Sequence, residues 1–209
     1  HIAKKGQPVM LATGASTIDD VKMAMNILES YTKNLVLMQC NTNYTADYEN
    51  FKYINLNVLK TYKTLFPNIE LGLSDHTPGD ITVLGAVALG ITMVEKHFTD
   101  NNDRKGPDHP FSMNPKTWKE RVTRTRLLEL SLGDTIKKVE ENESETVVLQ
   151  RRSIRVIKDL PKHHILQEED LIEVRPCPKD AIPPSEYVIG KTLNINLNKN
   201  DYLKYEHIR

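Results

Sequence analysis

Hydrophobic runs and amphipathic stretches alternate over the first 133 residues. Four short runs are apolar at nearly every position, as in strands buried on both faces of a parallel sheet: 8–13, 34–40, 69–75 and 90–98. Four longer stretches carry apolar residues at helical spacing or are apolar throughout: 16–31, 50–66, 80–90 and 114–133. The alternation predicts an α/β domain built from four strand–helix units.

End signals support these boundaries and bear on the size of the sheet. Ser16 or Thr17 can cap the first helix, with Asp19 and Asp20 in its first turn. Four strand–helix units are half of an eight-stranded barrel, which takes about 250 residues. A small open α/β sheet is the alternative. The chain opens at His1 in what resembles a helix tail, so we expect an N-terminal part of the protein before it.

The texture of the chain changes after residue 133. Residues 134–146 are charged and aperiodic, which predicts a linker. Residues 147–209 contain short β-like pieces separated by polar, proline-rich turns: 153–159, 170–176, 187–197 and 202–208. They predict a small β-rich domain, which could bury only a marginal core by itself.

Charge and cysteine content narrow the classes of function. The 28 basic and 28 acidic residues balance, which gives no electrostatic footprint for nucleic acid or an anionic membrane surface. No apolar run has the length of a membrane span. Cys40 and Cys177 lack a C-x-x-C spacing, and although one bridge is arithmetically possible, two lone thiols favour a cytoplasmic protein.

Polar clusters follow all four predicted strands, where the ligands of parallel sheets bind. The third strand ends in Asp75 and His76, and the fourth ends in Glu95, Lys96 and His97. Because neighbouring strands lie about 5 Å apart, the two histidines could bind one divalent metal. Either carboxylate could orient an imidazole. The alternative is that each histidine is a surface or capping residue.

Nearby residues allow both a functional and a structural interpretation. Lys96 points away from its neighbour His97, which favours a salt bridge to the outer helix layer. Tyr44 could bond a ligand or plug the rim, and Asp108 lies in a loop that could close over the site. The amides near Gly14 could hold an anion, a weak signal, and Cys40 favours a packing role.

Several ordered motifs resemble a known family. They are "LATGAS" (11–16), "CNTNY" (40–44), "SDHT" (74–77), "EKHFT" (95–99) and "GPDHPFS" (106–112). Together they resemble the sialic acid synthases, which include N-acetylneuraminate synthase and its legionaminic and pseudaminic acid relatives. The stretches 150–176 and 188–193 resemble the family's C-terminal SAF domain, which is similar to type III antifreeze protein.

The resemblance implies a fold and a reaction. The fold would be the second half of a (β/α)8 TIM barrel (1–133), a linker, and a SAF/antifreeze-like domain (147–209). The reaction would condense phosphoenolpyruvate with the aldehyde of an N-acetylated amino sugar, typically N-acetylmannosamine. The products would be a nonulosonic acid and phosphate. The lysines that bind phosphoenolpyruvate would lie upstream of His1, so this chain alone is expected to be inactive.

The resemblance also implies roles for individual residues. His76 and His97 would hold a divalent metal, usually Mn²⁺ with Mg²⁺ or Co²⁺ as alternatives, which would polarise the aldehyde. Tyr44 and Glu95 would complete the catalytic group. Phosphoenolpyruvate would lie near Tyr44, Thr42 and Ser74, and the sugar hydroxyls near Glu95 and Asp108. Arg175 would enter the active site of the partner subunit in a homodimer.

The chain departs from the family's sequence pattern at three places, and two other functions are alternatives. The family often has Ser at Ala12 and Pro at Thr45, and its loop after Arg175 reads differently from "RPCPKDAI". Another enzyme of this class could act on a phosphorylated or a bacillosamine-type sugar. A non-catalytic carbohydrate-binding or assembly module derived from this fold is the alternative from a different class.

Overall fold

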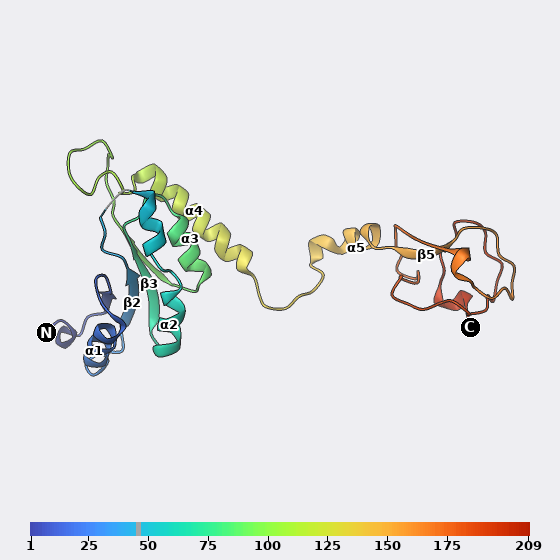
Figure 1. The fold of residues 1–209 in the computed structure, drawn as a ribbon, viewed down its shortest axis with the longest axis horizontal. Helices are drawn as coiled ribbons and strands as arrows, with labels where there is room; N and C mark the ends of the chain where they lie inside the picture. The colour runs from blue at the N-terminus through green and yellow to red at the C-terminus, as the bar shows by residue number, and fades with distance from the viewer. Residues whose placement is uncertain (45–46) are drawn as a thin grey trace. The chain divides into compact units, whose positions relative to one another are not determined.

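The computed structural model describes residues 1–44 and 47–209, so Thr45 lies outside the described residues. The chain is divided into two compact units, His1–Asp134 and Thr135–Arg209 (Figure 1). Each is described by itself below.

The first unit is built on a parallel sheet, in which Figure 1 labels β2 and β3. The strand order is β1-β2-β3-β4. The strands are β1 (Val9–Ala12), β2 (Leu35–Cys40), β3 (Glu70–Asp75) and β4 (Met93–Lys96). Each strand pairs with the next one in the sequence, so the four predicted strands are confirmed as one continuous sheet. Their carboxyl ends meet at one edge, where Cys40 is paired with Ser74 and Asp75 with Lys96.

A helix follows each strand, and α1 and α4 begin at side-chain caps. They are α1 (Ile18–Glu29), α2 (Val58–Leu65), α3 (Ile81–Ala88) and α4 (Pro115–Leu132). At the start of α1, Thr17 and Asp20 form a reciprocal capping box, and the Thr17 hydrogen bonds lower the pKa of Asp20. At the start of α4, Asn114 and Thr117 do the same.

Two predicted elements are shorter in the structure. The helix expected over 50–66 is divided into η2 (Tyr48–Tyr53) and α2, because Asn55 between them has a left-handed backbone with φ of 51°. Asn tolerates this conformation better than most residues. The strand expected over 90–98 is reduced to β4, and beyond it Phe98 forms only an isolated bridge to Met113.

The two faces of the sheet differ in what covers them. Leu35, Leu37, Leu71 and Leu73 belong to a buried core with apolar side chains from α1, α2 and α3. Successive side chains of a strand point to opposite faces. On the other face the outer strands are open, with Met10 60% exposed on β1 and Met93 38% exposed on β4. The candidate chemistry lies on this second face, at the carboxyl ends.

The second unit contains little regular structure. It comprises η3 (Glu141–Glu143), α5 (Ser144–Gln150), η4 (Glu168–Asp170), η5 (Tyr205–His207) and an antiparallel pair of strands, β5 (Ser153–Val156) and β6 (Leu171–Val174). The later β-like pieces form single bridges instead of strands, as between Leu160 and Leu197. Residues 141–146, expected to be an irregular linker, belong to η3 and the start of α5. A separate apolar core includes Ile182 and Leu193.

A buried carboxylate ties the loops of the second unit together. The Asp170 side chain is 1% exposed and accepts hydrogen bonds from Lys158 Nζ at 2.7 Å, His164 Nε2 at 2.6 Å and the Gln167 amide at 2.9 Å. Burial by itself raises the pKa of Asp170. The hydrogen bonds from Lys158, His164 and Gln167 outweigh burial and lower that pKa to about 2.

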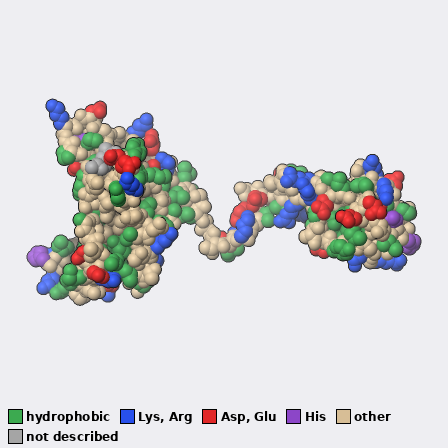
Figure 2. Space-filling view, viewed as in Figure 1, with side chains coloured by type: hydrophobic (Ala, Val, Ile, Leu, Met, Phe, Trp, Pro, Cys, Tyr) green, Lys and Arg blue, Asp and Glu red, His purple; other side chains and the backbone are tan. Residues whose placement is uncertain are grey.

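Acidic and basic side chains are interspersed on the visible face of each unit (Figure 2). Among the described residues, no helix has both the length and the apolar character that crossing a membrane requires.

Candidate active site

Four rings meet at the carboxyl ends of β2, β3 and β4. The ring centroids of His76 and His97 lie 5.2 Å apart. The Tyr44 ring lies 4.2 Å from His76 and 5.6 Å from His97. Phe111, from the loop after β4, lies 5.0 Å from His97. The two histidines that the sequence singled out are therefore neighbours in space.

His76 is held in one orientation and one tautomer. It is 3% exposed, and its Nδ1 lies 2.8 Å from the backbone carbonyl oxygen of Asn41 at the end of β2. A carbonyl oxygen only accepts, so Nδ1 carries the proton and donates it. The lone pair of Nε2 is then available for a metal or a proton. Backbone-oriented imidazoles of this kind are typical of metal-ligating histidines.

His97 has a looser environment. Its side chain is 23% exposed, and Nδ1 lies 3.5 Å from a carboxylate oxygen of Asp108, whose side chain is 51% exposed. The described residues supply two adjacent imidazoles, and among them no group of three or more His, Cys, Asp or Glu side chains is arranged around a common point. Two nitrogen donors fit a divalent transition metal that keeps its other positions for water and substrate.

Glu95 and Ser74 form a second polar pair on the same face. Ser74 Oγ donates to Glu95 Oε2 at 2.8 Å. The buried Cys40 thiol lies beside them. Burial raises the pKa of Cys40, opposed in part by a hydrogen bond with Ser74 and reinforced by the negative charge of Glu95. The thiol therefore stays neutral, which suits packing better than nucleophilic chemistry.

Lys96 and Asp75 have partners that the sequence pattern did not indicate. Lys96 does point away from His97, but its ammonium bonds Asp75 on the neighbouring strand at 2.6 Å. Among the described residues it pairs with no acidic group of the outer helices. Within the described part of the chain, neither Asp75 nor Glu95 bonds an imidazole. Side-chain alternation places Asp75 on the face opposite His76, so the expectation that Asp75 hydrogen-bonds an imidazole directly is wrong.

Gly14 allows a close approach of two loops. A Cβ built on Gly14 would lie 2.2 Å from Cγ2 of Thr42 and 3.1 Å from Sγ of Cys40. A side chain at residue 14 would therefore displace Thr42, an exposed residue at the end of β2. The glycine is explained by this contact, and the anion-binding interpretation of the turn has no support from it.

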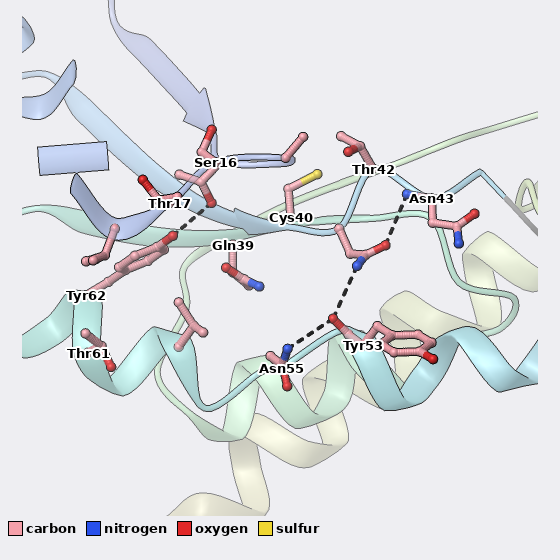
Figure 3. Close-up of a pocket in the computed structure, with 15 residues that line it drawn as sticks. Ser16, Thr17, Gln39, Cys40, Thr42, Asn43, Tyr53, Asn55, Thr61 and Tyr62 are labelled. Atoms are coloured by element: carbon pink, nitrogen blue, oxygen red, sulfur yellow. Dashed lines mark hydrogen bonds between the residues drawn. The ribbon is translucent and has the colours of Figure 1, made fainter. Parts of the chain in front are cut away.

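A cleft of about 930 Å³ opens beside these strand ends (Figure 3). None of the 15 described residues that line it is Asp, Glu, Lys, Arg or His. Hydroxyls and amides line it instead, including those of Ser16, Thr42, Asn43 and Tyr53, as Figure 3 shows. Such walls offer hydrogen bonds to an uncharged polar ligand. Asn41 joins the cleft to the histidine pair, since its side chain bonds the Tyr53 carbonyl while its backbone holds His76.

Arg175 lies in the second unit, immediately after β6. Its side chain is exposed, and Nε donates to the carbonyl oxygen of Gln150 at 2.6 Å. The hydrogen bond aligns one edge of the guanidinium and leaves its terminal nitrogens available. The role implied for Arg175 by resemblance stays a prediction.

Two contributors to this site were missed from the sequence. Asn41 acts through its backbone carbonyl, which any residue type could supply. Phe111 is 2% exposed and packs against His97, although it lies in a polar loop. The isolated aromatic residue in "GPDHPFS" was the available signal.

The fold and the site together define an α/β protein with a curled parallel sheet, a polar site at the strand ends and a small separate C-terminal unit. The comparisons with known proteins agree with this class. The chain belongs to the NeuB family, whose model matches residues 1–137, and a SAF domain matches residues 151–209.

Curated relatives carry several synthase names. The chain is 37% identical to the N,N'-diacetyllegionaminic acid synthase of Legionella pneumophila, with 100% of this chain and 59% of the relative covered. It is 30% identical to human N-acetylneuraminate-9-phosphate synthase, covering 98% of this chain and 56% of the relative. It is 31% identical to a pseudaminic acid synthase of Campylobacter jejuni, covering 100% and 60%. The chain thus spans less than two thirds of these relatives.

Solved structures give the same picture. The N-acetylneuraminic acid (sialic acid) synthetase of Leptospira borgpetersenii, crystallised with citrate, superposes with a TM-score of 0.62 at 27% identity. That match covers 70% of this chain and 50% of the other. The spore coat polysaccharide biosynthesis protein E of Chromobacterium violaceum has a TM-score of 0.69 over the whole chain and 62% of the other, and at 20% identity it supports the fold alone.

Proposed function

We propose that this chain supplies the metal-binding side of a synthase that joins phosphoenolpyruvate to an N-acetylated amino sugar. C3 of phosphoenolpyruvate would form a bond with the aldehyde carbon, whose oxygen takes up a proton. Water would add to C2, and the C2–O bond to phosphate would break. The products are a sialic-acid-type nonulosonic acid and inorganic phosphate. The observation that carries the proposal is the adjacent pair His76 and His97 in a chain of the NeuB family, with no hydrogen-bond partner for His76 Nε2 among the described residues.

We further propose that the four strands are half of a (β/α)8 barrel. The open face near Met10 and Met93 supports this, as does the partial coverage of the relatives. A second set of strands would cover that face and bring further substrate-binding groups to the same end. Within this scheme, the linker (134–146) and the SAF domain (147–209) follow the barrel.

The residues of this chain would divide the work as follows. His76 and His97 would hold a divalent metal, Mn²⁺ in our proposal, which would act as a Lewis acid on the aldehyde oxygen. Asp108 would orient His97 and, with Glu95, accept hydrogen bonds from the sugar hydroxyls. Ser74 already donates to Glu95 and would hold that carboxylate in place.

The other assigned residues would position the substrates. Tyr44 packs against both imidazoles, so its hydroxyl would serve the phosphoenolpyruvate side together with Thr42 and Ser74. Arg175 would anchor the amino sugar from the partner subunit of a homodimer, because a guanidinium binds carbonyl and hydroxyl oxygens in a fixed geometry. We also propose a cytoplasmic location, which the two free cysteines support.

The test uses the full-length protein and follows phosphate release from phosphoenolpyruvate. N-acetylmannosamine, its phosphorylated form and a bacillosamine-type sugar would be compared as acceptors, with Mn²⁺ and with a chelator. In ¹⁸O-labelled water, we expect the label in the keto acid and none in the phosphate, because the C2–O bond breaks. Released phosphate that carries the ¹⁸O label would contradict the proposed cleavage of the C2–O bond.

Variants make the site assignment sharp. His76→Asn should lower metal-dependent turnover by roughly a thousandfold, because it removes a metal ligand and with it the Lewis acid that stabilises the developing charge. His163→Asn, an exposed histidine in the second unit, is the matched control and should leave turnover unchanged. Folded His76→Asn protein that keeps full activity would rule out the two-histidine assignment. No release with any of the sugars would favour a non-catalytic carbohydrate-binding or assembly module.

Subunit mixing tests the proposed dimer. His76→Asn and Arg175→Ala subunits should each be inactive alone. If Arg175 serves the partner's site, random mixing gives one intact site in four, and about a quarter of wild-type activity should return. If mixed dimers regain no activity, Arg175 does not serve the partner's active site.

A further inference from the structure

A buried ion pair joins the ends of β3 and β4 on the face opposite the histidines. Lys96 Nζ lies 2.6 Å from Asp75 Oδ2, and the two side chains are 1% and 0% exposed. They cannot touch a substrate from this position. A buried ion pair is also weak evidence for stability, because desolvation of both charges offsets their attraction. Its position in the chain suggests another role, since Asp75 directly precedes His76 and Lys96 directly precedes His97.

The Lys96 ammonium brackets His76. Besides Asp75, it donates to the backbone carbonyl oxygen of Thr77. One cation on β4 therefore holds the residue before His76 and the residue after it. With both flanking residues fixed on one face, the side chain between them is directed to the other face. There the imidazole meets the Asn41 carbonyl.

The Asp75 carboxylate extends this network to the next helix. It accepts from the Thr77 amide at 3.0 Å, from the Thr77 hydroxyl at 2.8 Å and from the Thr82 hydroxyl at 2.7 Å. Thr77 and Thr82 are both buried. The turn that carries His76 is thus fastened to α3 as well as to β4.

We infer that Asp75 and Lys96 are positioning residues, which fix the spacing and direction of the His76 and His97 imidazoles. The pair lies on the helix-covered face of the sheet. It acts through the backbone of two strand ends on the histidine side chains of the opposite, open face. This inference rests on the proposed function only in treating the two histidines as the working groups. Loss of the pair should loosen the orientation of His76 first, because its turn is held from both sides.

The first test reads the His76 tautomer in metal-free, full-length protein. A long-range ¹H–¹⁵N spectrum of the imidazoles, with His76→Gln for assignment, should show His76 with its proton on Nδ1. The double variant Asp75→Asn/Lys96→Met removes both charges, so no unpaired charge stays buried, and the introduced amide keeps an acceptor oxygen for the threonines. It should fold, and its His76 signals should show tautomer averaging. An unchanged His76 spectrum would overturn the inference.

The second test measures metal binding directly. Free Mn²⁺ is followed by electron paramagnetic resonance during titration, so no turnover is needed. We expect the double variant to weaken Mn²⁺ binding by about tenfold or more, the range for residues that orient metal ligands. Lys22→Met, which removes an exposed lysine paired with Asp19 on α1, is the control and should not change it. A folded double variant with wild-type Mn²⁺ affinity would also overturn the inference.

The two tests separate the inference from the proposed function. If the wild type binds no Mn²⁺ but the His76 tautomer depends on the ion pair, the metal proposal fails and the positioning role stands. If the wild type binds Mn²⁺ through His76 and the double variant behaves like wild type in both tests, the metal proposal stands and the positioning role fails.

Discussion

Each unit contains a buried aspartate that is paired with a lysine, and the two pairs differ in how far solvent reaches the lysine. Asp75 and Lys96 are both inaccessible, and they link two strand ends and a helix of the first unit. Asp170 is equally buried, but Lys158 is 53% exposed, and His164, at 29%, shares the carboxylate. The first pair lies entirely inside the protein, whereas the second is a buried anion neutralised from the surface.

This difference teaches what each ion pair can do. A charge without solvent access keeps its partner in one geometry, because separating them leaves a bare charge in the interior. A half-exposed lysine can be replaced in part by water and salt ions. We therefore expect the Asp75 pair to control geometry next to the candidate site. The Asp170 cluster should instead make the stability of the second unit depend on pH.

Removal of Lys96 alone should have the largest effect on stability. Lys96→Met leaves the Asp75 carboxylate buried without its cation, which costs about 3 to 5 kcal/mol. Hydrogen exchange measured by mass spectrometry should show the loss in peptides from 70–98, with protection in 153–209 unchanged. A loss below about 1 kcal/mol would mean that water reaches Asp75, and the contrast between the two units would disappear.

Removal of the Asp170 charge should cost less. Asp170→Asn keeps the shape of the side chain but loses the charge-assisted bonds from Lys158 and His164, at about 1 to 3 kcal/mol. Exchange protection should fall in peptides from 153–174 only. Asp180→Asn is the matched control, because the Asp180 side chain is 53% exposed and its pair with Lys204 is a surface pair, so its effect should be clearly smaller than that of Asp170→Asn.

Acid should weaken the second unit within a narrow window. The folded pKa of Asp170, about 2, lies below its ordinary value of 3.8. The resulting stability is complete above the ordinary value and is lost as pH falls from about 4 to about 2. Allowing for solvent screening at Lys158, the loss is about 1 to 2 kcal/mol. Exchange protection as a function of pH should show this dependence in wild type and not in Asp170→Asn. The same slope in both proteins would exclude Asp170 as its source.

Removal of Lys158 should have the smallest effect. Lys158→Ala takes away a half-exposed partner whose own pKa is raised chiefly by its hydrogen bond to Asp170. His164 and the backbone amide of Gln167 still hold the carboxylate, so we expect the smallest loss of stability among these variants. High salt should reduce the difference between variant and wild type further. A cost equal to that of Lys96→Met would show that exposure does not distinguish the two clusters.

Much of the first unit followed from the sequence. Continuous apolar runs gave the strands, and helical spacing with capping residues such as Thr17 gave α1 and α4. Polar residues at strand ends pointed to His76 and His97, since parallel strands bring their carboxyl ends together. The break at Asn55 was not predicted, because a single left-handed residue leaves the helical spacing of its neighbours intact.

The second unit was harder to predict. Its β-like pieces were recognised, but most of them make single bridges, for example Leu193 with Ile208. Short segments of this kind are held by contacts between residues far apart in the chain. Local propensity therefore does not decide which of them become strands.

The sequence by itself determined the order of strands and helices, the residue types at the strand ends and the family. Those properties depend on local periodicity and on ordered motifs. The tertiary structure alone decided that the Asn41 carbonyl holds His76, that Phe111 packs on His97, and that Lys96 pairs with Asp75. Each of these depends on register between strands and on which face a side chain occupies. Such long-range distances are set only when the chain packs.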